Sequence, residues 1–224
     1  DIISERTGLH FEVVPNLTWP EAYDLALTGE IDVLPAVGGT DERDAQFILS
    51  KPYYYFKRVI VTIDNDTDIA KIEDLEGQMI AVQRNSSHHS YLLSHPKIHL
   101  SLYDSVEAAL TAVATGEERA FLGNLTTTNY LVRFHGLTNL RFVAFEAERQ
   151  QALYFAVRPD WPELASILNK ALATITESER QAINNRWIDL KTDFDYGPIL
   201  RIISIVGAVV TVVMVVSFFW IARL

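Results

Sequence analysis

The sequence predicts an α/β fold followed by one membrane-spanning helix. Before residue 199, short apolar runs alternate with longer segments that carry helix-capping residues, which is the pattern of an α/β protein. The stretch from Ile202 to Ala222 contains no charged side chain. At about 1.5 Å per helical residue it matches a hydrocarbon core about 30 Å thick. No amphipathic face can be drawn on it, so we expect a membrane span within residues 199–222 rather than a buried helix of a globular domain.

The residues near the end of the apolar stretch predict its orientation. Phe218, Phe219 and Trp220 lie where an interfacial belt of aromatic side chains is expected, and Arg223 follows shortly after them. Basic residues favour the cytoplasmic side, although Arg201 at the other end weakens this charge argument. We therefore expect the chain before about residue 199 to lie outside the cytoplasm.

The composition restricts the possible partners and the possible chemistry. The chain has 29 acidic and 19 basic residues and a net charge of -10, which argues against nucleic acid or anionic lipid headgroups as the main partner. It contains no cysteine, which excludes disulfide bonds, cysteine-ligated metals and thiol catalysis. The part before the apolar stretch is long enough for one two-lobed domain or two small domains, each stabilised by its core.

Strands and helices alternate from the start of the chain. Residues before Gly8 are typical of the end of a helix. Thr18 is a helix N-cap, Pro20 occupies the first turn, and Gly29 follows the last turn. The apolar run after Gly29 is typical of a buried parallel strand. The strands expected in this part are 10–14, 31–35, 47–49 and 58–63.

A second series of strands and helices follows. An alanine-rich helix begins after Ser105, and two capping-box patterns open later helices: Asp160 with Glu163, and Thr176 with Glu179. Together with the first series, this predicts two units of parallel sheet. The strands expected here are 79–83, 99–103, 120–122, 140–145 and 153–157, with helices that end at 93, run over 105–115 and 127–134, and close over 177–190.

Four motifs in this order resemble one known family. They are GEIDVLPAVGGTDERDAQFILSKPYY (29–54), DLEGQMIAVQRNSS (74–87), GEERAFLGNLTTTNYL (116–131) and LASILNKALATITESERQAINNRWI (164–188). The first holds the patterns Gly-x-x-Asp, Thr-x-x-Arg and Ser-x-Pro-Tyr. With the apolar stretch after them, the motifs resemble type II periplasmic solute-binding proteins of the amino-acid-binder class. Within that class they are most similar to the Venus-flytrap sensor domains of bacterial membrane receptors, such as sensor histidine kinases and diguanylate cyclases.

The resemblance implies a two-lobed domain that closes on a small solute between its lobes. Residues 1–58 would form the first part of lobe 1, shortened at its N-terminus, and 59–147 would form lobe 2. Residues 148–195 would return to lobe 1 and add the closing helices. Closure would pass through the last soluble helix and residues 191–199 to the span of a single-pass receptor in the inner membrane. Such a receptor is expected to have a periplasmic sensing domain and to be a homodimer.

Arg43 is the first candidate for ligand binding. It follows the strand 31–35, and a guanidinium there offers two parallel hydrogen bonds to a carboxylate at the edge of the sheet where clefts form. It also matches the arginine with which the family binds a carboxylate. From the residues alone, a surface arginine paired with Asp41 or Glu42 remains an alternative.

Three further candidates lie on the same side of the predicted cleft. Thr40 either donates its hydroxyl to the ligand or caps the following turn. Gly38 stands where amino-acid binders usually have a hydroxyl residue, which leaves backbone N–H groups alone at this position. Trp19 either walls the pocket or packs beside Pro20.

The candidates on the other side are Asn85, Ser86, Ser87 and Asn124. The first three precede a helix, so their N–H groups and hydroxyls either contact an anionic ligand or cap that helix. Asn124 stands where binders of free amino acids carry the aspartate that pairs with the ligand's ammonium, and an amide supplies no such charge. We therefore expect a carboxylate or another small polar solute rather than a standard α-amino acid.

Other kinds of site are less well supported. His88, His89, His95 and His99 resemble a metal-binding tract, but His88 and His89 would point to different sides of a helix and no carboxylate sits at ligand spacing. We expect solvated or capping histidines and no metal or other cofactor.

Two other functions stay open on the same scaffold. A solute-binding component of an amino-acid ABC transporter is usually free or tethered at its N-terminus, unlike this chain. An enzyme would need an acid/base pair in the cleft, and no nucleophile elbow, phosphate loop or paired carboxylates are apparent. We therefore expect no enzymatic activity in this segment.

Overall fold

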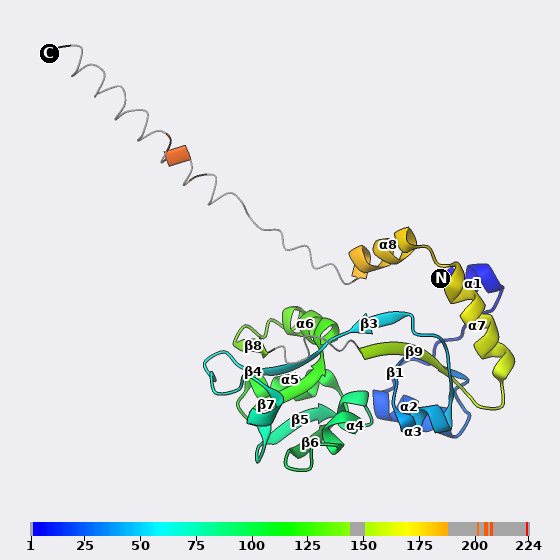
Figure 1. The fold of residues 1–224 in the computed structure, drawn as a ribbon, viewed down its shortest axis with the longest axis horizontal. Coiled ribbons are helices and arrows are strands. Elements are labelled where there is room, and N and C mark those ends of the chain that lie inside the picture. The colour runs from blue at the N-terminus through cyan, green and yellow to red at the C-terminus, as the bar shows by residue number, and fades with distance from the viewer. Residues whose placement is uncertain are drawn as a thin grey trace. The chain divides into compact units, whose positions relative to one another are not determined.

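The computed structural model describes residues 2–143 and 151–187, together with residues 201, 204, 205, 207 and 223 (Figure 1). The chain divides into two units, residues 1–181 and 182–224, and both β-sheets belong to the first. No helix among the described residues is long and apolar enough to cross a membrane. The span predicted over 199–222 lies almost entirely outside these residues, and so does the connector 191–199.

Lobe 1 is built on a four-stranded sheet whose central strand comes late in the chain. β9 (Gln151–Val157) pairs antiparallel with β1 (Val33–Gly38), β2 (Ile48–Leu49) and β3 (Tyr54–Phe56). The parallel sheet predicted for this part is therefore wrong in its pairings. β1 and β2 do run in the same direction, but β9 returns from lobe 2 in the opposite direction and takes the central position.

Helices cover both faces of this sheet. Ala156 and Val157, neighbours on β9, point to opposite faces. Ala156 belongs to the core that Tyr23 and Ala26 build from one side, and Val157 packs with Leu168 on the other. The helices are α1 (Ile2–Thr7), α2 (Trp19–Leu27), α3 (Asp41–Gln46) and α7 (Pro162–Thr174).

Lobe 2 is a five-stranded mixed sheet in the order β6-β5-β7-β4-β8. β5 is parallel to β6 and β7, whereas β4 is antiparallel to β7 and β8. Its strands are β4 (Arg58–Ile63), β5 (Met79–Gln83), β6 (His99–Tyr103), β7 (Ala120–Asn124) and β8 (Leu140–Val143). The helical elements are the 3₁₀-helix η1 (Ile72–Leu75), α4 (Ser87–Leu93), α5 (Val106–Ala114) and α6 (Leu125–Phe134).

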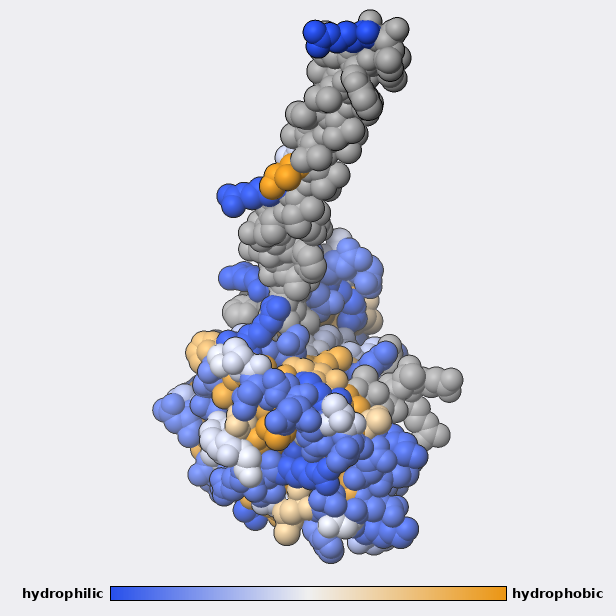
Figure 2. Space-filling model, turned by 90° about the vertical axis from the view of Figure 1, so that its left-hand side faces the viewer, coloured by the Kyte–Doolittle hydropathy of each residue, from blue (hydrophilic) through white to orange (hydrophobic). Residues whose placement is uncertain are grey.

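Strand periodicity divides the apolar side chains of lobe 2 between two cores. Ile60 and Leu122 pack on the face covered by α4, and Val61 and Phe121 pack on the face covered by α5 and α6. All four are at most 1% exposed. The side of the molecule that carries β4, β7 and β8 is mostly hydrophilic, with hydrophobic residues in separate patches (Figure 2), as expected for a lobe whose apolar residues are enclosed by its helices.

Several local predictions can be compared with the observed elements. The strand expected over 10–14 is absent, because these residues pair with no strand of the described chain and Val13 is 81% exposed. The capping box at Asp160 is also wrong: Asp160 binds Arg158 at 2.6 Å, and α7 starts at Pro162.

The capping box at Thr176 and Glu179 is confirmed. Thr176 N–H donates to Glu179 Oε2 at 2.8 Å, and Glu179 N–H donates to Thr176 Oγ1 at 3.3 Å. This reciprocal pair opens α8 (Glu177–Trp187), and residues 188–190 of the predicted helix lie outside the described residues.

Removing a buried side chain from the lobe 2 sheet should destabilise the domain. Leu122 is 0% exposed in β7, so Leu122→Ala should lower the free energy of unfolding by about 2–5 kcal/mol. Leu93 has the same side chain but is 64% exposed at the end of α4, so Leu93→Ala should change it by less than about 0.5 kcal/mol. Urea denaturation of the two variants measures this, and equal effects would contradict the assigned core.

Candidate functional site

Arg43 lies where the two lobes meet. Thr40 caps α3, its Oγ1 accepting from the Arg43 N–H at 3.3 Å, and the first turn of this helix turns Arg43 inward. The Arg43 side chain is 2% exposed. Its Nη1 donates to the Gly38 carbonyl within lobe 1, and its Nη2 donates across to the Asn85 carbonyl of lobe 2, both at 2.5 Å. One guanidinium therefore donates a hydrogen bond to each lobe.

Two aromatic rings of α2 enclose this guanidinium. The Cζ atom of Arg43 lies 5.6 Å from the ring centre of Trp19 and 5.3 Å from that of Tyr23. At these distances the ring faces attract the cation and also shield it from water. Trp19 adds a second bond between the lobes, since its Nε1 donates to the same Asn85 carbonyl at 2.8 Å.

Asn85 presents its carbonyl to lobe 1 because of its backbone conformation. Its φ is 55°, in the left-handed region, where asparagine is found more often than most residues. The kink separates the end of β5 from α4, and the Asn85 N–H donates to His89 Nδ1 at 3.3 Å. The carbonyl is thereby left to accept both bonds from lobe 1.

Gly38 allows the lobes to approach closely beside Arg43. A Cβ atom at this position would lie 2.3 Å from Ser87 Oγ and 2.7 Å from Ser87 Cβ, which is closer than real atoms pack. Ser87 is 8% exposed and begins α4 on the opposite lobe. The Ser87 side chain therefore occupies the space that a side chain at position 38 would need.

The other predicted site residues act as helix caps in the structure. Ser86 Oγ accepts from the His89 N–H at 3.1 Å and caps α4. Asn124 Oδ1 accepts from Thr126 N–H at 2.8 Å and from Thr127 N–H at 3.3 Å, and caps α6. Among the described contacts none joins Asn124 to Arg43. The structure thus gathers Trp19, Gly38, Thr40, Arg43, Asn85 and Ser87, with Ser86 behind them and Asn124 apart.

Sequence reasoning missed two residues of this region. Tyr23 was not a candidate, although it follows Trp19 by four positions and so lies on the same helix face. His88 was expected to be solvated or capping, and this is wrong, since it is 9% exposed and its ring lies edge-on to Phe56 at 5.7 Å. Leu92, four residues further along and 1% exposed, marks the same buried face of α4.

The charges around the site favour an anion. Burial lowers the pKa of Arg43, while the hydrogen bond to Tyr23 raises it, and an arginine keeps its proton under these conditions. No carboxylate of the described residues forms an ion pair with Arg43, and its partners are neutral carbonyls and rings. A carboxylate would supply the missing charge and two parallel acceptors.

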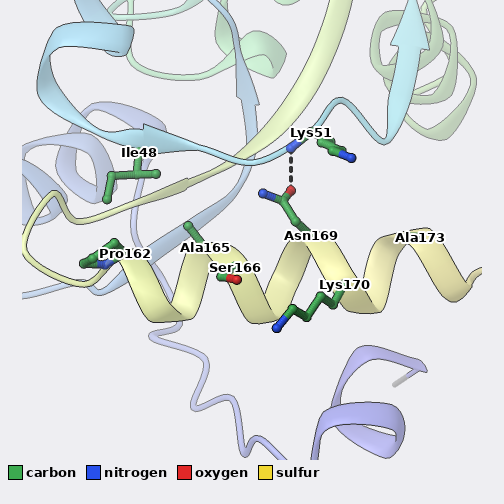
Figure 3. A pocket seen from close by; sticks show the side chains of 8 residues that line it. All are labelled: Ile48, Lys51, Pro162, Ala165, Ser166, Asn169, Lys170 and Ala173. Atoms are coloured by element: carbon green, nitrogen blue, oxygen red, sulfur yellow. Dashed lines mark hydrogen bonds between the residues drawn. The ribbon is translucent and has the colours of Figure 1, made fainter.

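A separate groove lies elsewhere on lobe 1. It has a volume of about 440 Å³ between α7 and the segment that follows β2, where the Lys51 N–H donates to Asn169 Oδ1 at 2.6 Å (Figure 3). None of the residues that contact Arg43 lines it. No group of three or more His, Asp or Glu side chains suited to a metal ion occurs within the described part of the chain.

The family of the chain follows from comparison with known proteins. The family model of bacterial extracellular solute-binding proteins, family 3, matches residues 1–190. The chain belongs to this family. Residues 1–190 are therefore an extracytoplasmic solute-binding domain with the two-lobed α/β fold described above.

Two curated proteins and one solved structure illustrate what this chain is similar to. Virulence sensor protein BvgS of Bordetella pertussis is 32% identical over 187 residues, which cover 83% of this chain and 15% of BvgS. The probable amino-acid-binding protein YxeM of Bacillus subtilis is 31% identical over 65% of this chain and 56% of YxeM. The crystal structure of a histidine kinase sensor domain superposes with a TM-score of 0.76 at 26% identity, covering 84% of this chain and 82% of that one. The chain thus spans a small part of BvgS and about half of YxeM.

A side chain at Gly38 should force the lobes apart. Gly38→Ser places atoms where Ser87 lies, and overpacking of this kind costs about 1–3 kcal/mol, which an opening of the lobes would relieve. Small-angle X-ray scattering should show a larger radius of gyration. Ser87→Gly in the same chain makes room for the new side chain and should reverse the change, whereas an unchanged radius in the single variant would contradict the contact.

Acid should destabilise the domain through His88. Burial, together with the nearby charges of Arg58 and Arg43, lowers the pKa of His88 from an ordinary value of 6.5 to about 3. Below pH 6.5 the His88 side chain binds a proton in the unfolded chain but not in the folded one. The free energy of unfolding therefore keeps its full value above pH 6.5 and falls by up to about 1.4 kcal/mol per pH unit below it.

Denaturation of the protein and of His88→Gln between pH 7 and pH 5 tests this. The glutamine side chain does not titrate, so stability of the variant should fall less steeply with acid. Other titrating groups contribute equally to both curves, and parallel curves would exclude His88 as the cause.

Proposed function

We propose that this chain is the ligand-sensing part of a single-span bacterial signalling receptor. The observation that carries the proposal is the buried guanidinium of Arg43, which bonds lobe 1 and lobe 2 at once. A solute that binds Arg43 therefore changes the hydrogen bonding between the two lobes. The similarity to sensor protein BvgS and to a histidine kinase sensor domain supports signalling as the use of that movement.

The solute proposed is a small carboxylate. Arg43 is the one charged side chain of the contact between Trp19, Gly38, Asn85 and Ser87, and its charge has no carboxylate partner among the described residues. A carboxylate can replace the neutral carbonyls and form charge-assisted bonds, which are about twice as strong as neutral ones. The Asn85 carbonyl would lose its bond to Arg43 in exchange, so the solute changes the interaction between the lobes directly.

The solute need not carry an α-ammonium group. Asn124 has no charge, and its Oδ1 already accepts two N–H groups at the start of α6. Among the described residues, no carboxylate is hydrogen-bonded to Arg43, Trp19 or Asn85. None is therefore placed to pair with an ammonium group of the solute. Organic acids therefore fit this contact better than amino acids do.

Transmission is proposed to run through α8 into the segment 188–199 and the span 199–222. A helix at the end of the solute-binding domain that continues into one span gives lobe closure a mechanical route across the membrane. Closure is favoured only by the difference in solute affinity between closed and open lobes. We further propose a homodimer with a histidine kinase or a diguanylate cyclase as output, on the basis of similarity alone.

A transport function is the second candidate. The 31% identity with the probable amino-acid-binding protein YxeM favours it, because the same cleft could deliver a solute to a permease. The uncharged stretch from Ile202 to Ala222 favours the receptor, since a binding component that shuttles between membrane and solution has no use for a C-terminal span.

A ligand screen tests the proposed function. Thermal unfolding of the protein should be measured with amino acids, organic acids and polyamines. A solute at a hundred times its dissociation constant stabilises the folded state by about 3 kcal/mol. We expect an organic acid to give this shift and Arg43→Lys to lose most of it, since a lysine keeps the charge but not the paired donors.

The matched control is Arg133→Ala, which removes an exposed arginine from the last turn of α6. This variant should keep the full shift. Stabilisation by a solute that survives in Arg43→Lys, or stabilisation by polyamines alone, would contradict the assigned role of Arg43.

A further inference from the structure

The first turn of α8 is tied to the rest of lobe 1 at two successive residues. Glu179 receives a hydrogen bond from Arg6 Nη2 at 2.5 Å, and Arg6 Nη1 donates to Thr174 Oγ1 at 2.9 Å. Arg180 Nη1 donates to the backbone carbonyl of Tyr53 at 2.9 Å. Arg6 belongs to α1 and Thr174 ends α7, so the Arg6–Glu179 contact joins α8 to α1, and the Arg6–Thr174 bond fixes Arg6 to α7 of the same lobe. The third contact, to Tyr53, is of a different kind.

Tyr53 stands at the start of the strand through which the chain crosses from lobe 1 to lobe 2. Its side chain is held by lobe 1: the hydroxyl donates to the Pro35 carbonyl and the ring packs against Phe155 at 4.9 Å. The next residue reaches the other lobe, where the Tyr54 hydroxyl lies 3.1 Å from Thr126 Oγ1 of α6. The chain therefore passes from one lobe to the other along β3, whose backbone still pairs with β9 while the Tyr54 side chain contacts lobe 2. This crossing strand begins at the peptide between Tyr53 and Tyr54.

The carbonyl that Arg180 binds belongs to that peptide. Its direction is set by ψ of Tyr53, because a peptide group turns as one plane. Lobe closure in two-lobed proteins is absorbed by φ and ψ changes at a few residues between the lobes. A rotation there turns the acceptor of Arg180, while the bond between Arg6 and Glu179 keeps its geometry because both partners lie in lobe 1.

We infer that Arg180 couples the hinge to α8. It acts as a positioning residue that turns the start of α8 when the Tyr53–Tyr54 peptide rotates, with the Arg6–Glu179 ion pair as the fixed point. This inference rests on the proposed function, in which the relation between the lobes is the signal. It adds the side chain, Arg180, through which α8 moves when the lobes open or close.

The chain contains no cysteine, so spin labels can be placed at single engineered cysteines. Asp24→Cys with Ala108→Cys, two exposed positions on α2 and α5, reports the separation of the lobes in the full chain. Asp24→Cys with Gln181→Cys reports the position of the start of α8 relative to lobe 1. Pulsed electron–electron double resonance measures both distances. Gly38→Ser is expected to open the lobes, so no known solute is needed.

Gly38→Ser should lengthen the first distance and shift the second. In Arg180→Gln the first change should persist and the shift at α8 should be lost, because the link to the hinge is weakened without affecting the lobe contact. Arg180→Lys keeps a charged donor and should restore the shift at least in part. Arg133→Gln, the same substitution at an exposed site on α6, should behave like the parent protein.

Two results would overturn the inference in different ways. If α8 shifts equally in Arg180→Gln, Arg180 is not the coupling residue, and the proposed function is untouched. If Gly38→Ser leaves the separation of the lobes unchanged, the lobe contact does not control closure, and both the closing step of the proposed function and the inference fall. A general loss of packing in Arg180→Gln would lengthen the lobe distance before Gly38→Ser is introduced, which also counts against a coupling role.

Discussion

The hydrogen bond from Arg43 to the Asn85 carbonyl is the interaction on which the functional part of this structure depends. It joins a buried cation of lobe 1 to a backbone group of lobe 2, and Trp19 donates to the same carbonyl. A buried arginine is costly unless its donors and its charge are satisfied. In this structure backbone carbonyls accept from Nη1 and Nη2 and two aromatic rings face the cation, but no carboxylate among the described residues balances its charge.

Local backbone geometry places each partner of that bond. The Thr40 cap starts α3 so that Arg43 faces inward, the left-handed Asn85 turns its carbonyl outward from β5, and Gly38 leaves room for Ser87. None of these features is a strong interaction by itself. Together they allow a single guanidinium to contact two lobes that have separate cores. In the proposed function this contact reports lobe closure, and the bond from Arg180 to the Tyr53 carbonyl transmits it to α8.

Much of the fold could be predicted from the sequence, because it depends on neighbouring residues. The strands 58–63, 79–83 and 99–103 have the predicted bounds, and the box of Thr176 and Glu179 forms as expected. Arg43, Thr40, Gly38 and Trp19 were found from motifs after a strand or at a helix start. The structure brings them together, although their role in binding a solute stays a prediction.

The features that could not be predicted depend on pairs far apart in the chain. Nothing near β9 indicates that it lies between β1 and β2, since the order of strands is set by long-range packing. The closeness of Gly38 and Ser87 joins two lobes, so neither segment alone reveals it. His88 was misjudged because its polarity outweighed its position on the buried face of α4, where Phe56 and two arginines surround it.

The most direct test of this account is nuclear magnetic resonance of the arginine side chains, with nitrogen-15 label and Arg43→Lys for assignment. The account predicts slowly exchanging Nη protons for Arg43, with through-space contacts to Asn85 and to the Trp19 ring. A titration with the stabilising carboxylate should shift these signals before any others. Rapidly exchanging Arg43 protons without contact to Asn85 would show that the guanidinium does not hold the two lobes, and would contradict the account.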